Sequence, residues 1–299
     1  MILALGMILD ALLGEPRWLW SRVPHPAVVM GRAVASLDNA FNAGRNRKLR
    51  GALVMLALGA AAIALGLVLT AFPFQIAEII CVAILLAQRS LAQHASAVGN
   101  ALRLSLADGR KSVAMIVGRD TAEMDAASIS RSAIESAAEN LSDGVIAPAF
   151  WFLVGGLPGL FVYKITNTAD SMIGYKTEAY REFGWAAARF DDLLNLIPAR
   201  LTALLIWLTA PRPDLPAKIR AEAPQHRSPN AGWPEAAAAH HLDVALSGPR
   251  TYGGRVIDYP FVNAAGQKNL GPKDVDRMVS LLWKTWGIAL IAVLAIALF

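Results

Sequence analysis

GALVMLALGAAAIALGLVLTAFPFQIA, residues 51–77, is the stretch that decides the fold. It contains no charged residue, and it exceeds the roughly 20 residues with which an α-helix crosses a bilayer. Pro73 separates it from a further apolar run, and proline interrupts a helix because it lacks a backbone N–H. The pattern therefore predicts a helical hairpin, with spans at residues 52–71 and 75–92 and a turn at Phe72 and Pro73.

The composition is typical of a membrane protein. Hydrophobic residues make up 55% of the 299 residues and charged residues 17%, whereas soluble domains carry about 25% charged residues. The net charge of +5 is spread over loops beside apolar runs, which indicates membrane topology and lipid headgroups rather than nucleic acid. The single cysteine, Cys81, excludes a disulfide within the chain and a Cys-based zinc site.

Three further apolar runs lie at residues 144–163, 193–211 and 279–299. The first contains GGLPG at positions 155–159, so we expect a broken or re-entrant segment. Residues 1–9 are also apolar but have no basic n-region and no cleavage site, which favours a retained membrane segment over a signal peptide. The prediction is an all-α, polytopic membrane helical bundle with about four to six membrane segments and polar helical loops.

We expect one integral-membrane domain over residues 1–299. Its extramembrane regions are expected at about residues 15–50, 93–143, 164–192 and 212–278. Residues 15–50 carry seven Lys/Arg against two acids, so the positive-inside rule predicts a cytoplasmic loop of a multi-pass protein in the cell inner (plasma) membrane. The side of residues 164–192 stays open, because it depends on whether residues 144–163 cross the bilayer or are re-entrant.

A carboxylate stripe precedes the broken segment, in sequence that favours a helix with Thr121 as its N-cap. Glu135, Glu139 and Asp143 are four residues apart and share one helical face, so they repel one another unless a positive group offsets them. In one interpretation Arg131 supplies that charge. In the other a divalent cation such as Mg²⁺ does, and we favour it because acids at a membrane boundary are costly.

A second polar face follows the broken segment. Lys164, Asn167, Asp170 and Ser171 fall on one side of a helix. An acid with a nearby lysine suits a metal–phosphate site, in which the acid holds the metal and the lysine meets the phosphate. The alternative is a lysine that reaches the membrane surface and an asparagine that caps a helix.

Asp191 and Asp192 directly precede the next apolar run. Paired acids bind metals, and they also cap helix N-termini, here for a helix from Leu193 onward. Both interpretations stay open.

The histidines give no catalytic motif. His240 and His241 are adjacent and point about 100° apart on a helix, His226 is isolated, and His25 lies in a Pro-His-Pro turn. The sequence has no hydrolase motif and no P-loop with the required glycine spacing. Classical hydrolase chemistry is therefore unsupported.

Segments along nearly the whole chain resemble the CobD/CbiB family, which are membrane enzymes of cobalamin biosynthesis. The N-terminal match is DALLGEP at positions 10–16, followed by His25-Pro26 and Gly31-Arg32. The other main matches are ESAAENLSDG at 135–144, YKITNTADSMIGYKT at 163–177, FGWAAARFDD at 183–192, SPNAGWPEA at 228–236 and YGG at 252–254.

The resemblance implies an ATP- and Mg²⁺-dependent amide ligation. A carboxylate of adenosylcobyric acid is joined to the amine of aminopropanol or its O-phosphate, which gives adenosylcobinamide or its phosphate. The implied partners are the corrinoid, the amine and membrane lipid, with no nucleic acid. A homo-oligomer, or a complex with other cobalamin-pathway enzymes, stays open.

The candidate residues follow from the two polar faces and the matched motifs. The catalytic candidates are Glu135, Glu139, Asn140, Lys164, Asn167 and Lys176. The substrate-binding candidates are His25, Arg32, Ser171, Tyr175, Asn230 and Trp233. The metal candidates are Glu139, Asp143, Asp170, Asp191 and Asp192.

Two other function classes are alternatives. One is a metal-dependent membrane phosphotransferase or prenyltransferase acting on a lipid-linked substrate, which needs matched acidic motifs and no ATP. The other is a non-enzymatic transporter or scaffold. Transporters tend to show matched halves with interrupted helices, and this sequence shows one interrupted segment.

Overall fold

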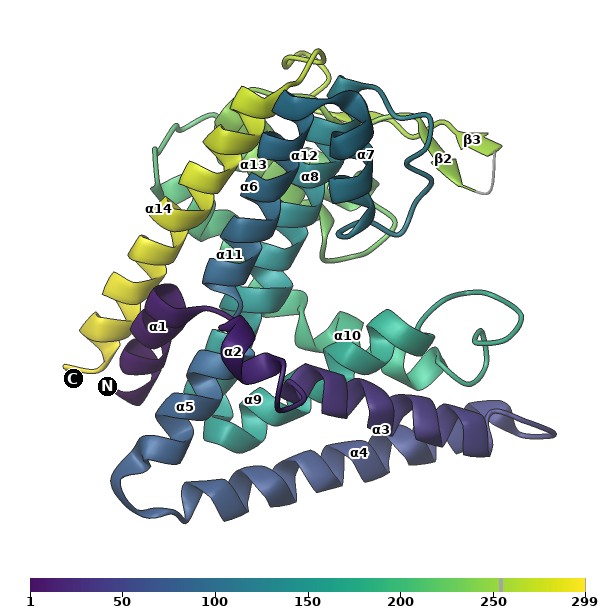
Figure 1. Cartoon of the computed structure of the whole chain (residues 1–299), viewed down its shortest axis with the longest axis vertical. Coiled ribbons are helices and arrows are strands. Elements are labelled where there is room, and N and C mark those ends of the chain that lie inside the picture. The colour runs from purple at the N-terminus through teal and green to yellow at the C-terminus, as the bar shows by residue number, and fades with distance from the viewer. Residues whose placement is uncertain (253–254, 299) are drawn as a thin grey trace. The chain divides into compact units, whose positions relative to one another are not determined.

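Helices dominate the computed structural model, which describes residues 1–252 and 255–298 (Figure 1). The chain divides into two compact units, each made of two separate stretches. Unit 1 comprises Met1–Ala87 and Asp143–Leu196, and unit 2 comprises Gln88–Ser142 and Ile197–Phe299. This division into units does not test the expectation of one integral-membrane domain over residues 1–299, which stays a prediction.

Unit 1 is helical wherever regular structure is described. Its elements are α1 (Ile2–Leu13), α2 (Arg17–Trp20), α3 (Pro26–Phe41), α4 (Arg47–Thr70), the 3₁₀ turn η1 (Pro73–Gln75), α5 (Ile76–Leu85), α9 (Ala147–Ile173) and α10 (Trp185–Leu194). Helix α9 is central, because α3, α4, α5 and α10 all pack against it. A small core of Ala147, Tyr163 and Leu194 joins α9 to α10.

The predicted hairpin is present, with one correction. Helix α4 covers the first predicted span, and η1 forms the turn that begins at Pro73. The second span, expected as one helix over residues 75–92, is interrupted: α5 ends at Leu85, and Leu86 has extended backbone angles. The amide N–H of Ala87 donates to the carbonyl of Gly144 at 3.1 Å, a partner that periodicity along one segment does not reveal.

The predicted interruption of the apolar run at residues 144–163 is confirmed. Residues Ser142–Ile146 form a π-helical turn, and α9 then contains non-helical angles at Gly155 and Gly156. Gly156 has φ of +59°, a left-handed conformation that glycine adopts without steric cost. Asp143 lies in the π turn, whereas Glu135 and Glu139 lie in the α-helix before it, and their shared face stays a prediction.

In the described part of the chain, unit 2 adds two small two-stranded sheets to its helices. Its elements are α6 (Gln88–Leu104), α7 (Leu106–Ala114), α8 (Ala126–Leu141), α11 (Leu196–Leu208), α12 (Leu215–Glu222), the 3₁₀ turn η3 (Ala223–Gln225), α13 (Gly232–Leu242), β1 (Leu246–Ser247), β2 (Arg250–Tyr252), β3 (Arg255–Ile257), β4 (Phe261–Val262) and α14 (Pro272–Ile296). Strand β1 pairs antiparallel with β4, and β2 pairs antiparallel with β3.

Helix α8 is the centre of unit 2, because α6, α7, α13 and α14 all pack against it. It begins later than predicted, since its N-cap is Asp125, whose side chain accepts from the Ser128 N–H at 2.7 Å. The assignment of Thr121 as the N-cap is therefore wrong. Gly253 and Gly254 of the YGG motif lie outside the described residues.

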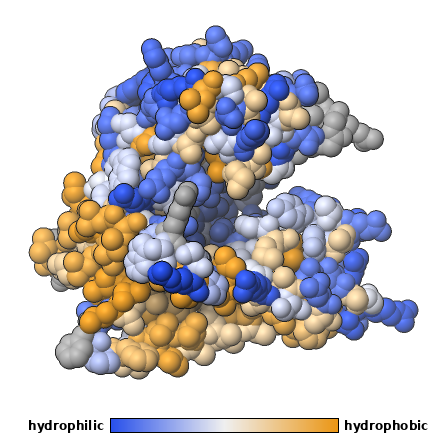
Figure 2. Space-filling model, in the orientation of Figure 1, coloured by the Kyte–Doolittle hydropathy of each residue, from blue (hydrophilic) through white to orange (hydrophobic). Residues whose placement is uncertain are grey.

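The expected all-α membrane bundle is confirmed. Among the residues that the structure describes, four helical segments are long and apolar enough to cross a bilayer, and α1 and α11 are shorter apolar helices. The four segments are Arg47–Thr70, Ile76–Leu104, Ala126–Ile173 and Pro272–Ile296. Figure 2 shows hydrophobic side chains gathered along α4, at the lower edge of the view. Hydrophilic side chains cover the region of α7 and the N-terminal end of α14.

Close packing of α4 gives a first prediction. A Cβ on Gly51 would lie 1.9 Å from the carbonyl oxygen of Phe183, whereas a Cβ on Gly59 of the same helix meets nothing within 4 Å. Gly51→Ala should therefore destabilise the protein by about 1–3 kcal/mol, as overpacking does. Gly59→Ala should be neutral or slightly stabilising. Thermal unfolding in detergent measures both, and equal melting temperatures would contradict the packing described.

Candidate functional site

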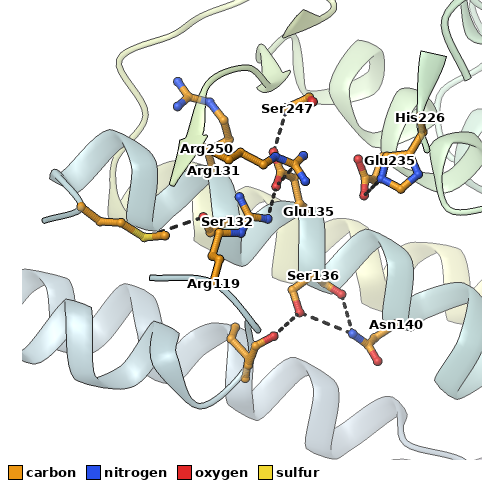
Figure 3. A network of polar contacts seen from close by, with 12 residues as sticks. Arg119, Arg131, Ser132, Glu135, Ser136, Asn140, His226, Glu235, Ser247 and Arg250 are labelled. Carbon is orange, nitrogen blue, oxygen red and sulfur yellow. Dashed lines mark hydrogen bonds and ion pairs between the residues drawn. The ribbon is translucent and has the colours of Figure 1, made fainter. Parts of the chain in front are cut away.

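Glu135 is the centre of a buried polar network in unit 2 (Figure 3). Its side chain, on α8, is 2% exposed. Arg119 Nη2 donates to its Oε2 at 2.7 Å, Arg250 Nη2 lies 3.1 Å from the same oxygen, and the Ser247 N–H donates to Oε1 at 2.6 Å. The carboxylate thus ties α8 to the loop before it and to the strands β1 and β2.

Arg131 has a different role from the one expected. Its Nε donates to the carbonyl of Ala245 at 3.1 Å, its Nη2 donates to the carbonyl of Lys268 at 2.8 Å, and its guanidinium lies 5.3 Å from the Phe261 ring centre. The interpretation that Arg131 is the main countercharge of the stripe is therefore wrong. Arg119 and Arg250 pair with Glu135, and no local sequence pattern links those three positions.

Glu139 and Asn140 lie one turn further along α8. Glu139 is partly buried, and Arg227 is its strongest charged neighbour. Asn140 is exposed, and its Nδ2 donates to the carbonyl of Ser136 at 2.9 Å. Both residues stay catalytic candidates.

His226 and Glu235 form a contact that the sequence did not indicate. His226 Nε2 lies 3.6 Å from Glu235 Oε1, and His226 Nδ1 accepts from the Ser228 N–H at 3.0 Å. Burial, with the positive charges of Arg250 and Arg227, lowers the pKa of His226 to about 4. Burial, with the neighbouring Glu135 and Glu139, raises the pKa of Glu235 well above its usual range. Both shifts favour the uncharged form of the group.

Asn230 and Trp233 meet at one arginine. Arg200 Nη1 donates to Asn230 Oδ1 at 3.3 Å, and the Arg200 guanidinium lies 4.6 Å from the Trp233 ring centre. The structure brings these two substrate-binding candidates together, and it shows that one face of the indole already packs against a cation.

Asp191 is the centre of the polar network of unit 1. It lies within α10, so the interpretation that Asp191 and Asp192 cap a helix beginning at Leu193 is wrong. Asn167 Nδ2 donates to Asp191 Oδ1 at 3.3 Å, and Asn195 Nδ2 donates to Oδ2 at 3.0 Å. Tyr163 completes the network, because its hydroxyl donates to Asn195 Oδ1 at 3.0 Å.

Burial and the neighbouring carboxylate of Asp170 raise the pKa of Asp191 to about 7. The two amides only partly offset this effect. The pair of Asp170 and Asp191 therefore favours a cation that would stabilise both charges. Asp192 is partly exposed, and its carboxylate lies 3.5 Å from Arg189 Nη1.

Lys164 and His25 also belong to unit 1. The acids that act most strongly on Lys164 are Asp143 and Glu15. His25 caps α3, since its Nδ1 accepts from the Ala27 N–H at 3.2 Å, and its ring meets Trp20 edge-on at 4.5 Å. Its Nε2 is buried and, among the described residues, has no hydrogen-bond partner.

The remaining candidates lie at the surface. Arg32, Ser171, Tyr175 and Lys176 are all exposed. Ser171 shares α9 with Lys164, whereas Tyr175 and Lys176 follow the end of that helix. Their roles stay predictions.

The metal candidates do not form a complete protein-made cage. In residues 1–252 and 255–298, no three His, Cys, Asp or Glu side chains converge closely enough to hold an ion. Glu139 belongs to unit 2, and the other four metal candidates belong to unit 1. Mg²⁺ is commonly bound by one or two carboxylates and substrate phosphates, so Asp170 and Asp191 fit such a partial site.

Comparison with known proteins decides the family. The sequence model described as CobD/CbiB protein matches residues 3–282. The chain belongs to the CobD/CbiB family. A protein of Brucella anthropi named cobalamin biosynthesis protein CobD is 47% identical, over 99% of this chain and 96% of its own length. Proteins with the same name are 47% identical in Rhizobium meliloti, over 100% and 97%, and 44% in Rhodobacter capsulatus, over 94% and 91%. No solved structure matches.

The network of Glu135 gives a prediction about stability. Glu135→Gln leaves the buried guanidinium of Arg250 and the partly buried one of Arg119 without their carboxylate, so the free energy of unfolding should fall by about 3–5 kcal/mol. Glu123→Gln, at an exposed position of the preceding loop, is the matched control and should change it by less than about 0.5 kcal/mol. Equal melting temperatures for the two variants in detergent would contradict the buried pairing.

Asp191 gives a prediction about pH. Its pKa of about 7 in the folded protein exceeds the ordinary 3.8, so the folded state retains a proton that the unfolded chain loses between those values. Without divalent cations, stability should therefore fall by roughly 2–4 kcal/mol as pH rises from 4 to 8. Asp191→Asn should flatten most of this dependence, and Asp192→Asn, which removes a smaller contribution, should flatten it less. Melting temperatures across that pH range in EDTA test it, and parallel profiles for all three proteins would refute it.

Proposed function

We propose that this protein is an enzyme of cobalamin biosynthesis that joins a carboxylate of adenosylcobyric acid to the amine of aminopropanol or its O-phosphate, with ATP and Mg²⁺. Membership of the CobD/CbiB family supports the pathway. The structural observation that carries the reaction is the Asp170–Asp191 pair, a buried donor set that suits a cation bound together with phosphate.

The proposed chemistry has two steps. A carboxylate oxygen of the corrinoid attacks the γ-phosphorus of ATP, ADP leaves, and an acyl phosphate forms. The amine nitrogen then attacks the acyl carbon, inorganic phosphate leaves, and the nitrogen loses a proton as the amide forms. Both steps build or move negative charge on phosphoryl oxygens, so they need fixed positive groups and a site that limits water.

Residues of this chain match those needs. Asp170 and Asp191 would hold Mg²⁺, which when bound neutralises phosphoryl charge. Asn167 and Asn195 fix the orientation of the Asp191 carboxylate. We assign Lys164 as the cation that binds phosphate. The nearby carboxylates of Asp143 and Glu15 attract its ammonium group.

The membrane setting suits the substrate. A corrinoid is large and partly apolar, and ligand sites combine apolar walls with a few polar groups that fix orientation. Trp233, stacked on Arg200 beside Asn230, offers such a combination in unit 2. We propose the plasma membrane as the location, with the ATP-binding residues on its cytoplasmic side.

The test is an assay of the purified protein in membranes with adenosylcobyric acid, ATP, Mg²⁺ and either amine, and mass spectrometry of the product. We expect an amide product that requires ATP. Glu139→Gln should reduce its rate by roughly 100-fold or more without loss of membrane insertion. Glu123→Gln should retain the wild-type rate.

Two results would overturn the proposal. One is a folded wild-type protein that makes no amide under these conditions, which would favour a metal-dependent transferase acting on a lipid-linked substrate. The other is amide formation that proceeds equally well without ATP. Full activity of Glu139→Gln would remove that residue from the site without touching the reaction.

A further inference from the structure

Glu235 has a carboxyl oxygen with nothing to bind. The residue lies in the first turn of α13 and is 2% exposed. Its Oε1 faces His226, whereas its Oε2 is buried and has no hydrogen-bond partner within the part of the chain that the structure describes. Most buried polar atoms in proteins are paired, because an unpaired one loses its hydrogen bonds to water without replacement. Such an atom indicates a ligand.

The orientation of this oxygen is fixed by His226. Because His226 Nδ1 accepts from the Ser228 N–H, the neutral ring carries its proton on Nε2, which faces Glu235 Oε1. One carboxyl oxygen thus faces the imidazole at 3.6 Å, and Oε2 is left for another group. Figure 3 shows the two side chains next to each other, with the carboxyl group on the side of Glu135.

The charged groups around Glu235 favour a positively charged ligand. Glu135 and Glu139 are its acidic neighbours, and the positive neighbours are Arg250 and Arg119. Those two arginines are already paired with Glu135. His226 adds no charge, since burial and nearby arginines keep its pKa low. Burial disfavours the charged form of this carboxyl group, and a positive group that donates hydrogen bonds would offset that cost.

A metal ion is a poor match for this position. Glu135, the acid that acts most strongly on Glu235, is already paired with Arg119 and Arg250, so it does not offer a second carboxylate to a metal ion. A primary amine needs less, because its compact head forms charge-assisted hydrogen bonds to individual carboxyl oxygens. The chemistry that fits is therefore an alkylammonium group.

We infer that Glu235 binds the primary amine of the substrate through Oε2 and that His226 is the positioning residue that aims it. This inference rests on the proposed function, in which the amine is the one substrate with a positive head group. The amine would bind within unit 2, and Glu235 would fix the position of its nitrogen. Neither Glu235 nor His226 was among the residues that the sequence motifs indicated for catalysis or binding.

The experiment compares Glu235→Gln with wild type in the amide-forming assay. Gln preserves size and packing but removes the charge that pairs with an ammonium group. The KM for the amine should rise roughly 10–100-fold, as expected for a lost charge-assisted hydrogen bond, while the KM for ATP should change less than about twofold. Melting temperatures in detergent verify that the variant is folded.

A similar pair in the same unit supplies the control. Glu222 Oε2 lies 3.0 Å from His240 Nε2 and accepts from the Asn263 N–H at 2.7 Å, so this oxygen is already satisfied. Glu222→Gln should leave the KM for the amine unchanged. Two substitutions of His226 separate its two contacts. His226→Asn can retain a group that accepts from the Ser228 N–H, and His226→Gln can retain a group that donates toward Glu235. His226→Gln should therefore disturb the KM for the amine less than His226→Asn.

Direct binding separates this inference from the proposed reaction. Saturation-transfer NMR with aminopropanol, in the absence of ATP and corrinoid, should show binding to wild type that weakens at least about tenfold in Glu235→Gln. Propane-1,2-diol, which lacks the amine, should show no difference between the two proteins. If Glu235→Gln does not fold, Glu235→Asp, which withdraws the carboxylate by one methylene, takes its place.

The outcomes are distinct. If wild type makes amide and Glu235→Gln has the amine KM of Glu222→Gln, the inference is wrong and only water occupies the position. If wild type makes no amide but binds aminopropanol through Glu235, the proposed function fails and the amine site stands. Equal binding of aminopropanol to wild type and Glu235→Gln overturns the amine site in either case.

Discussion

The buried carboxylate of Glu135 is the constraint on which the polar half of unit 2 depends. A buried charge is tolerated only when it is paired and hydrogen-bonded, and here two guanidinium groups and one backbone N–H meet that requirement. These partners come from the loop before α8 and from β1 and β2. Burial is the largest cause of the pKa shifts of His226 and Glu235, and members of this network also contribute: Arg250 lowers the pKa of both residues, and Glu135 raises that of Glu235.

Unit 1 solves the corresponding problem differently. Asp191 is buried beside another carboxylate, and its hydrogen-bond donors are the neutral amides of Asn167 and Asn195. Amides orient a carboxylate but do not cancel its charge, so the group holds its proton up to about neutral pH. A cation supplied with a phosphate substrate would complete this arrangement. Glu135 is thus paired with positive groups and Asp191 only with neutral amides, and on this contrast we propose a ligand-binding role for Asp191.

Local sequence signals predicted the parts of the fold that depend on local physics. The uncharged run at residues 51–77 and its proline predicted α4 and the turn, and the glycines at 155 and 156 predicted the break in α9. The interruption after Leu85, the π turn and the partners of Glu135 depend on contacts between distant segments. The contact of His226 with Glu235 is of the same kind. His226 lies in the loop before α13 and Glu235 lies in that alanine-rich helix, and no sequence periodicity relates the two positions.

The central claim is that the protein activates a carboxylate with ATP before an amine attacks it. Isotope transfer tests this most directly, with adenosylcobyric acid that carries ¹⁸O in the reacting carboxylate, together with ATP, Mg²⁺ and aminopropanol or its O-phosphate. An acyl phosphate requires one ¹⁸O atom to appear in inorganic phosphate for each amide formed. Amide formation with no ¹⁸O in any product derived from ATP would contradict the account.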